Sequence, residues 1–423
     1  MFKKILALTL TVLMLVTLCV SFASCGKKRL GEGEEILPRK EITSDVTIPA
    51  DFKIGLITLH DENSTYDKNF IDAFTQVCEA MGLVANTSYY IVSNIDESEA
   101  CYNTAIDLAK NKGCKVVFAD SFGHEDYMKQ AAVECPTVQF CHATGVSAKT
   151  SNIANFHNAF AAIYEGRYLA GIVAGMKLNE MIDSGKIKAE EAIMGYVGAF
   201  TYAEVISGLS SFYLGAKSVC PSVTMKVRFT GSWYDQALEQ EAANSLINQY
   251  KCVLISQHAD SLGAPTACQQ AKVPNVSYNG STYSAGKDTW LVSSAINWAP
   301  YFQYIIEKTA KGETFDTDWT GTIATNSVVL SGLNLDVIAE GTETKVQEAL
   351  DGFKAGTLHV FDTSKFTVKF VEGEVVTVKT TLTSLNCPYV HDGYFDESNA
   401  ATFMSAPYFS YEIDGIEFLN TKY

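Results

Sequence analysis

Positive charge is scarce in this sequence. The chain of 423 residues carries 32 Lys and Arg against 48 Asp and Glu, a formal net charge of -16 at pH 7. Nucleic acids and anionic membrane surfaces both reward clustered Lys and Arg, so neither is expected as the partner of the folded part. Hydrophobic residues make up 47% of the chain, and residues 51–423 are long enough for two domains with real cores.

Motifs of catalytic and metal sites are missing as well. The chain has no Gly-x-Ser-x-Gly elbow, no His-Glu-x-x-His and no Gly-x-x-x-x-Gly-Lys-Ser/Thr loop, and its seven histidines are scattered singly. We therefore expect a protein that is not an enzyme and uses no cofactor and no metal. A catalytic pair assembled only in space stays open, and nucleoside hydrolysis is the competing activity.

Cysteine pairs at redox or zinc spacing are also absent. Of eleven cysteines, nine follow residue 26, and none stands in a Cys-x-x-Cys pair. Several lie in apolar runs such as residues 252–255, where a buried free thiol acts as a small hydrophobe. We expect mostly free thiols; a disulfide framework is the alternative, less common in a chain of this size.

The longest apolar run lies at the N-terminus. Residues 1–4 are Met-Phe-Lys-Lys, residues 5–20 are apolar, and small residues precede Cys25. This pattern is typical of a secretory signal and is too short to span a bilayer. We predict a lipoprotein signal over residues 1–25, with Cys25 as the lipidated first residue of the mature chain; an ordinary signal peptide or an uncleaved anchor is the alternative. Residues 26–50 are rich in charge, Gly and Pro, which predicts a flexible tether outside the cytoplasm.

Short apolar runs alternate with amphipathic stretches along the rest of the chain. Residues 53–59 form the first expected strand, and a helix follows with Phe70, Phe74 and Val77 on one face. Further strands are expected at residues 116–119, 138–140, 193–197, 224–229, 253–256, 276–278 and 290–292. The pattern predicts an α/β protein of two successive lobes, each a mostly parallel sheet flanked by helices. Ligands of such sheets bind at the carboxyl ends of the strands, so a ligand cleft is expected between the lobes.

The C-terminal stretch gives a weaker pattern. Residues 358–363 and 366–371 predict strands, with a turn over residues 372–374. We expect residues 389–395 to be a surface elaboration of the second lobe.

Polar and aromatic side chains gather in the loops that follow the strands. Ser64 and Asp67 stand at capping-box spacing after the first strand, so Asp67 can serve a helix N-terminus as well as a ligand. Trp233 and Asp235 precede a later helix, where they can pack and cap it, or stack on a flat ligand and accept its N–H. The candidate ligand-binding residues are Asp67, Phe70, Ser121, Phe122, Trp233, Asp235, His258, Asn279, Asn297 and Trp298. Such amides and aromatics suit a planar heterocycle that donates and accepts hydrogen bonds.

Several segments, taken in their order, resemble a known family. They are residues 66–70 (Tyr-Asp-Lys-Asn-Phe), the run from Phe122 to Phe140, residues 164–171 (Tyr-Glu-Gly-Arg-Tyr-Leu-Ala-Gly) and residues 231–235 (Gly-Ser-Trp-Tyr-Asp). Over essentially all of residues 51–423 the chain resembles the basic-membrane-protein (PnrA-like) lipoproteins, extracytoplasmic solute receptors of ABC importers. The resemblance implies a type I periplasmic-binding fold whose two lobes close around a small molecule, and a permease and ATPase as partners of a lipid-anchored monomer.

The resemblance also sets expected boundaries and roles. Chain crossings near residues 158, 288 and 326 would divide the chain into lobe 1 (51–157 with 288–325) and lobe 2 (158–287 with 326–423). In nucleoside-binding members the first loop supplies an Asp and a stacking aromatic, which map onto Asp67 and Phe70.

The sequence departs from those members at two positions. Their ribose-binding Asp and a Lys are replaced by Asn279 and Asn297, which puts ribose recognition in doubt. Residues around Trp233, His258 and Trp298 resemble the purine-binding branch, so the expected ligand is a purine base, with a nucleoside as the alternative. Phe70 and Trp233 or Trp298 are expected to stack on the base, while Asp67, Ser121, Asn279 and Asn297 contact its edge.

Overall fold

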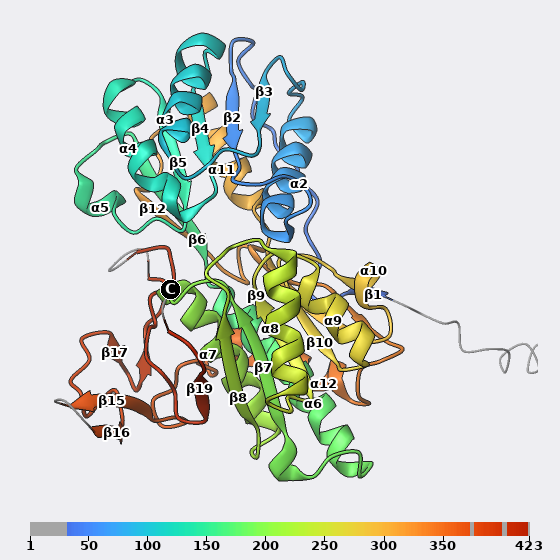
Figure 1. Ribbon diagram of the computed structural model, residues 1–423. Helices are drawn as coiled ribbons and strands as arrows, with labels where there is room; N and C mark the ends of the chain where they lie inside the picture. The colour runs from blue at the N-terminus through green and yellow to red at the C-terminus, as the bar shows by residue number, and fades with distance from the viewer. Residues whose placement is uncertain (1–31, 373–375, 400–403, 422–423) are drawn as a thin grey trace, which may run out of the picture.

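The computed structural model describes residues 32–372, 376–399 and 404–421, which form two α/β lobes, one above the other in Figure 1. One lobe contains a six-stranded sheet and the other a seven-stranded sheet. This architecture confirms the predicted two-lobed fold. It follows from the alternation of buried strands with amphipathic helices, each of which covers a sheet face with its apolar side.

Lobe 1 has an all-parallel sheet in the order β12-β6-β5-β4-β2-β3. Its strands are β2 (Ile54–Ile57), β3 (Tyr89–Val92), β4 (Val116–Ala119), β5 (Gln139–Ala143), β6 (Phe156–Ala161) and β12 (Asp318–Gly321). Its helices are α2 (Thr65–Ala80), α3 (Glu99–Ile106), α4 (Glu125–Glu134), α5 (Ala148–Ser151) and α11 (Ala299–Ala310). One apolar core lies under α2 and α11 and another under α3 and α4, so both sheet faces are buried.

Lobe 2 has the sheet order β13-β11-β10-β9-β7-β8-β19, with only β13 antiparallel to its neighbour. Its strands are β7 (Ile193–Gly198), β8 (Thr224–Phe229), β9 (Leu254–His258), β10 (Asn275–Tyr278), β11 (Trp290–Ile296), β13 (Val328–Leu330) and β19 (Ile416–Phe418). Its helices are α6 (Ile163–Asp183), α7 (Ala203–Val219), α8 (Gln236–Asn248), α9 (Gly263–Ala271), α10 (Tyr283–Gly286) and α12 (Thr342–Lys354).

The chain passes between the two sheets three times, after β6, after β11, and between β12 and β13. The first two passages lie later than residues 158 and 288, where we expected them. β6 continues to Ala161 in the first sheet, and β11 pairs with β10 and β13 in the second, so residues 290–296 belong to lobe 2 rather than lobe 1. The third passage contains Asn326, between β12 and β13.

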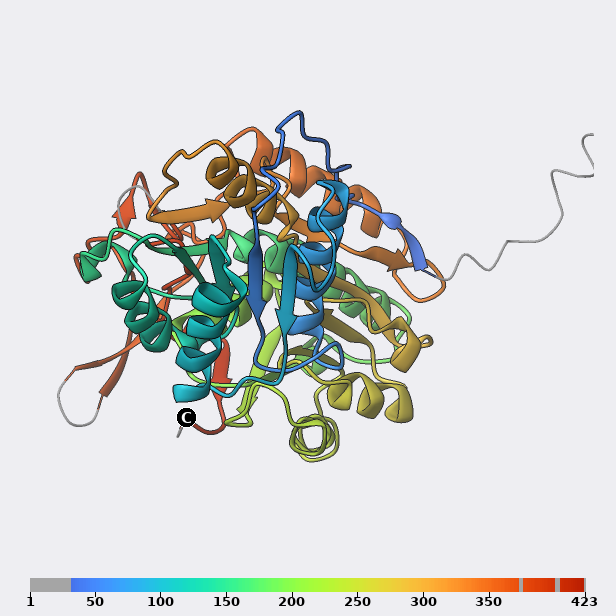
Figure 2. The ribbon, with the colours of Figure 1, turned by 90° about the horizontal axis from the view of Figure 1, so that it is seen from above.

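The N-terminal segment lies on the folded body from residue 32, which corrects the predicted tether over that part. β1 (Glu32–Glu35) pairs with β14 (Gly332–Asn334) of the second lobe, and Leu37 is buried in that lobe's core. Ile42 and Ile48 pack against the core of lobe 1. The segment therefore bridges both lobes (Figure 2). The predicted signal and Cys25 lie outside the described residues.

The C-terminal part adds to lobe 2 and touches lobe 1. β15 (Val368–Glu372) pairs with β16 (Val376–Thr380), β17 (Val390–His391) pairs with β18 (Tyr394–Phe395), and β19 extends the sheet beside β8. The strand expected over residues 358–363 is absent there apart from one isolated bridge at Asp362, and the expected turn falls largely outside the described residues. Ser405 donates to the Asp318 carboxylate of β12, a contact with lobe 1.

The nine cysteines that follow residue 26 are all free and buried, which confirms the prediction of free thiols. None of the helices in the described part of the chain combines the length and apolarity that a membrane crossing requires.

Two long helices of lobe 2 pack with their backbones in direct contact. A Cβ added at Gly171 of α6 would stand 2.1 Å from the carbonyl oxygen of Phe212 in α7. We predict that Gly171→Ala forces the helices apart and lowers the free energy of unfolding by about 1–3 kcal/mol, measured by urea denaturation. Gly280→Ala is the control, because the nearest atom to its added Cβ lies 3.9 Å away. Equal stability of the two variants would contradict the close packing.

Candidate functional site

A cavity lies between the lobes, at the carboxyl ends of strands from both sheets. It encloses about 400 Å³ of space outside the protein atoms, part of it open to solvent. Its lining residues are Leu59, His60, Tyr66, Asp67, Ser121, Phe122, Thr144, Glu204, Trp233, His258, Asp260 and Tyr278. Aromatic rings and carboxyl groups dominate this set, and no Lys or Arg is found among the described residues that line the cavity.

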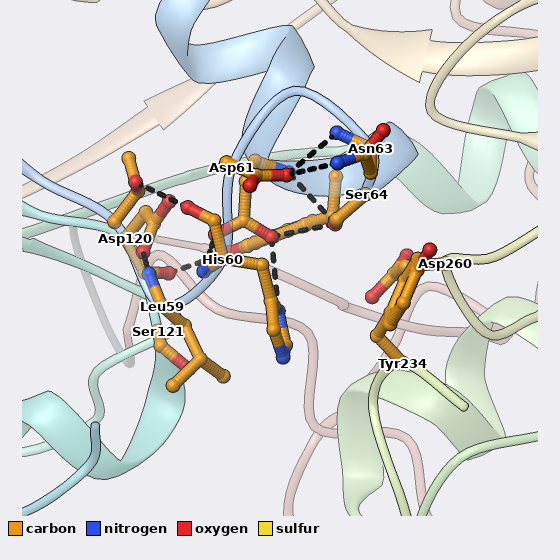
Figure 3. Close-up of polar contacts among 12 residues, drawn as sticks. Leu59, His60, Asp61, Asn63, Ser64, Asp120, Ser121, Tyr234 and Asp260 are labelled. Carbon is orange, nitrogen blue, oxygen red and sulfur yellow. Dashed lines mark hydrogen bonds and ion pairs between the residues drawn. The ribbon is translucent and has the colours of Figure 1, made fainter. Parts of the chain in front are cut away.

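The wall from lobe 1 is built around the loop after β2 (Figure 3). Ser64 caps α2, and its hydroxyl donates to the Asp67 carboxylate at 2.6 Å. The backbone N–H of His60 donates to the same carboxylate at 2.8 Å. Burial alone would raise the pKa of Asp67, but hydrogen bonds from His60 and Ser64 outweigh it and leave the pKa below its ordinary value. Asp67 is therefore a fixed anion in the cavity wall.

Two further carboxyl groups are buried nearby. Burial raises the pKa of Asp120 well above its usual range, and the charge of Asp67 adds to the effect. Burial likewise raises the pKa of Asp260, with the charges of Asp67 and Glu239 adding to it. Both effects favour the protonated form of Asp120 and Asp260. The Tyr66 hydroxyl donates to the backbone oxygen of Asp120 at 2.8 Å and fixes that ring in the wall.

In the wall from lobe 2, His258 contacts the carboxylate of Glu204. Nε2 of His258, at the end of β9, lies 2.9 Å from the carboxylate of Glu204 in the first turn of α7. The Tyr278 hydroxyl contacts the other oxygen of Glu204 at 3.4 Å. Both side chains of the pair are largely buried, with 4% of His258 and 13% of Glu204 exposed. Glu204 thus faces the cavity as a positioned acceptor.

Contacts across the cleft show that the lobes are closed in this structure. The backbone N–H of Thr65 in lobe 1 donates to the backbone oxygen of Asp260 in lobe 2 at 2.9 Å. The ring of Phe122 stacks on Tyr202 with centroids 4.7 Å apart, and His60 packs against Tyr234 at 5.4 Å. Tyr234 and Asp260 face the 59–64 loop from the opposite side in Figure 3.

The structure brings five of the ten predicted residues together in the cavity wall: Asp67, Ser121, Phe122, Trp233 and His258. Ser121 also donates from its hydroxyl to Glu97 at 2.6 Å, so one of its hydrogen-bonding positions is already used. Asp235 lies outside the wall, where its carboxylate caps α8 by accepting from the backbone N–H groups of Ala237 and Leu238.

Phe70 and Trp298 lie in the core of lobe 1, not at the cavity. Their rings stack on each other with centroids 4.2 Å apart, and Phe118 packs against both. Both side chains are almost fully buried. The structure therefore places them as core residues, because Phe70 continues the apolar face of α2 into the layer under α11.

The two predicted asparagines support the site from behind. Asn279 has a left-handed backbone (φ 65°), and its amide contacts the Asp260 carboxyl group at 3.3 Å. The Asn297 amide donates to the backbone oxygen of Asn326 at 2.9 Å, and its side-chain oxygen accepts from the N–H of Ala299 at the start of α11. Asn297 therefore links two of the passages between the lobes.

The remaining lining residues were not predicted. Tyr278 ends β10 and Thr144 directly follows β5, while His60 and Asp260 stand three and two residues beyond β2 and β9. Proximity to a strand end also identified His258, so this signal was sufficient to include all four. Leu59 belongs to the loop after β2 and Tyr66 to the first turn of α2, where an apolar and a helical position gave no polar signal. Glu204 carries no such mark, because it stands six residues beyond β7 in the first turn of α7.

The profile of one protein family matches most of the chain. The family described as "ABC transporter substrate-binding protein PnrA-like" matches residues 54–346. The chain belongs to this family of binding proteins, which confirms the predicted family. The match ends before the C-terminal part that carries β15 to β19.

Individual relatives share part of the chain. A putative ABC transporter glucose-binding protein of Haloferax volcanii is 34% identical over 49% of this chain and 49% of its own length. A purine-binding protein of Brucella abortus is 31% identical over 59% of this chain and 66% of its own. The chain thus spans about half to two thirds of the length of these curated relatives. A solved solute-binding protein from Conexibacter woesei shares the fold, with a TM-score of 0.58 at 20% identity over 73% of this chain and 98% of that protein.

The core position of Phe70 generates a stability prediction. Phe70→Ala should lower the free energy of unfolding by about 3–5 kcal/mol, because it leaves a void beneath Trp298 and Phe118. Urea denaturation measures the loss, and Phe122→Ala is the matched control, since Phe122 is only half-buried at the cavity. A Phe70→Ala variant as stable as the Phe122→Ala variant would contradict the core assignment.

Proposed function

We propose that this protein is the extracytoplasmic binding component of an ABC importer and that it captures a purine nucleobase by closure of its lobes. The observation that carries this proposal is the composition of the cavity wall, which combines aromatic rings with carboxyl groups and includes no Lys or Arg among its described residues. Rings offer stacking faces to a flat heterocycle, and carboxylates accept its N–H groups. The Brucella relative is named as a purine-binding protein, which agrees with this choice.

The charge of the wall argues for a neutral ligand. Asp67 and Glu204 face the cavity, and no Lys or Arg among the described lining residues is available to pair with a phosphate or carboxylate. An anionic ligand would lose its hydration without gaining a counter-ion. We therefore do not expect nucleotides to bind in this cavity.

A free base is favoured over a nucleoside by the two asparagines. Asn279 and Asn297 stand where nucleoside-binding members of the resembled family have a ribose-binding Asp and a Lys, and here both amides are engaged with protein groups. Neither residue lines the cavity. Ribose hydroxyls would have fewer polar partners than in those members.

Binding and transport would follow from closure. A purine that contacts both walls stabilises the closed form in which Thr65 meets Asp260, and the closed pair of lobes is presented to a permease driven by an ATPase. A lipid on Cys25 would keep the monomeric receptor at the membrane, with a neighbouring transporter as its partner.

A ligand screen tests the proposal. The soluble chain 26–423 is heated with adenine, hypoxanthine, guanine, the matching nucleosides and nucleotides, pyrimidines and glucose. A ligand that binds only the native state raises its melting temperature, so we expect a shift with purine bases alone. A shift with nucleosides only would make the protein a nucleoside receptor, and a shift with glucose only would place it with the Haloferax relative; either would contradict the proposal.

The aromatic wall gives a prediction for affinity. Trp233→Ala should weaken binding of the purine base by about 1–3 kcal/mol, roughly tenfold to a hundredfold in Kd, measured by titration calorimetry. Trp319→Ala is the matched control, because Trp319 is a half-buried Trp of lobe 1 outside the cavity. Unchanged affinity of the Trp233→Ala variant would contradict the contact.

A further inference from the structure

Lobe 2 buries a guanidinium among neutral partners. Arg167 of α6 is fully buried, and its hydrogen-bond partners in the described chain are neutral oxygens. Nη2 donates to the hydroxyls of Tyr196 at 2.9 Å and Ser256 at 3.0 Å, while Nη1 contacts the backbone oxygen of Ser277 at 3.3 Å. Burying a charge without an ionised partner lowers stability, so we expect the Arg167 side chain to have a functional role.

A chain of hydrogen bonds leads from this cation to the cavity. The Tyr196 hydroxyl of β7 lies 3.4 Å from Nδ1 of His258, and Nε2 of His258 lies 2.9 Å from Glu204. His258 and Glu204 both line the cavity, whereas Arg167 and Tyr196 lie behind it. All four residues belong to lobe 2, so this series of hydrogen bonds does not depend on closure of the two lobes.

The direction of the chain follows from the chemistry of its first member. A guanidinium only donates, so the Tyr196 oxygen accepts from Arg167 and its own proton is free to point at Nδ1 of His258. Burial raises the pKa of Tyr196 to about 12, which keeps that proton in place. Nδ1 then accepts, Nε2 carries the imidazole proton, and that proton is donated to Glu204.

We propose that Arg167, acting through Tyr196, fixes His258 as the Nε2–H tautomer and so keeps the Glu204 carboxylate a pure hydrogen-bond acceptor toward the ligand. Arg167 and Tyr196 are positioning residues, and the site selects a heterocycle that presents N–H donors to Glu204. This specificity rests on the proposed function, whereas the tautomer of His258 does not.

Space for the imidazole is provided by a glycine. A Cβ added at Gly208 of α7 would stand 2.7 Å from Nδ1 of His258. Gly208→Ala therefore displaces the imidazole ring of His258 but removes none of the hydrogen-bonding groups of Arg167, Tyr196, His258 and Glu204. It supplies a second variant that tests geometry rather than chemistry.

The first experiment compares two buried tyrosines of lobe 2. Tyr196→Phe removes the hydroxyl that links Arg167 to His258, and Tyr213→Phe removes a hydroxyl that contacts the backbone oxygens of Val223 and Asp414. With ¹⁵N-labelled histidine, the unaltered protein and the Tyr213→Phe variant should show His258 protonated at Nε2 only, and Tyr196→Phe should show a mixture of tautomers. His258→Gln assigns the signal.

Affinity for the purine bases is measured on the same proteins. We expect about a tenfold rise in Kd for Tyr196→Phe and for Gly208→Ala, and none for Tyr213→Phe. An imidazole protonated at Nδ1 or at both nitrogens in the unaltered protein, or equal losses of affinity in the two tyrosine variants, would overturn the proposal. If the unaltered protein binds no purine, the proposed function fails, and the tautomer measurement still decides the role of Arg167.

Discussion

The burial of several carboxyl groups in one cleft is the constraint on which the rest of the site depends. Asp67, Asp120, Asp260 and Glu204 gather where the strands of both lobes end, away from most solvent. Four ionised carboxylates there would repel one another strongly. Hydrogen bonds from His60 and Ser64 stabilise Asp67 as an anion, and His258 holds the Glu204 side chain in place. Burial raises the pKa of Asp120 and Asp260. The wall consequently offers carboxyl oxygens to a ligand, and its described residues include no Lys or Arg.

Hydrogen bonds join the terminal parts of the chain to the connections between the lobes and to β12 of lobe 1. Asn326, in the third passage, accepts from the Asn297 amide of the second and from the backbone N–H of Lys40, and it donates to the backbone oxygen of Pro38. The N-terminal segment is thus hydrogen-bonded to the third passage between the lobes. On the other side, Ser405 of the C-terminal part reaches Asp318 of β12. Both ends of the described chain therefore contact both lobes.

Much of the fold could be predicted from the sequence, because hydrophobic periodicity is a local property. The runs around Leu56, Val117 and Leu254 are buried strands, and the apolar face of α2 lies against its sheet as expected. The pairing of β1 with β14 could not be foreseen, since backbone hydrogen bonds make it and Glu-Gly-Glu-Glu carries no strand signal. The lobe to which β11 belongs is set by its pairing with β10 and β13, and hydrophobic periodicity carries no information on which strands pair.

The candidate site could be predicted in part for a similar reason. His258 ends β9, Phe122 stands three residues beyond β4, and Asp67 lies in the first turn of the helix after β2. Strand ends converge on the cleft whatever the details of the fold. Phe70 was misplaced because an aromatic ring at the start of a helix gives the same signal for core packing and for ligand stacking. Glu204 was missed because its role comes from His258, a partner 54 positions away in the sequence that only the fold brings within 2.9 Å.

A crystal structure of the protein with a bound purine base tests the central claim most directly. The account predicts closed lobes, the base in contact with Trp233, and one of its N–H groups within hydrogen-bond distance of the Glu204 carboxylate. A base bound outside the cavity, or one that turns an acceptor edge toward Glu204, would contradict it.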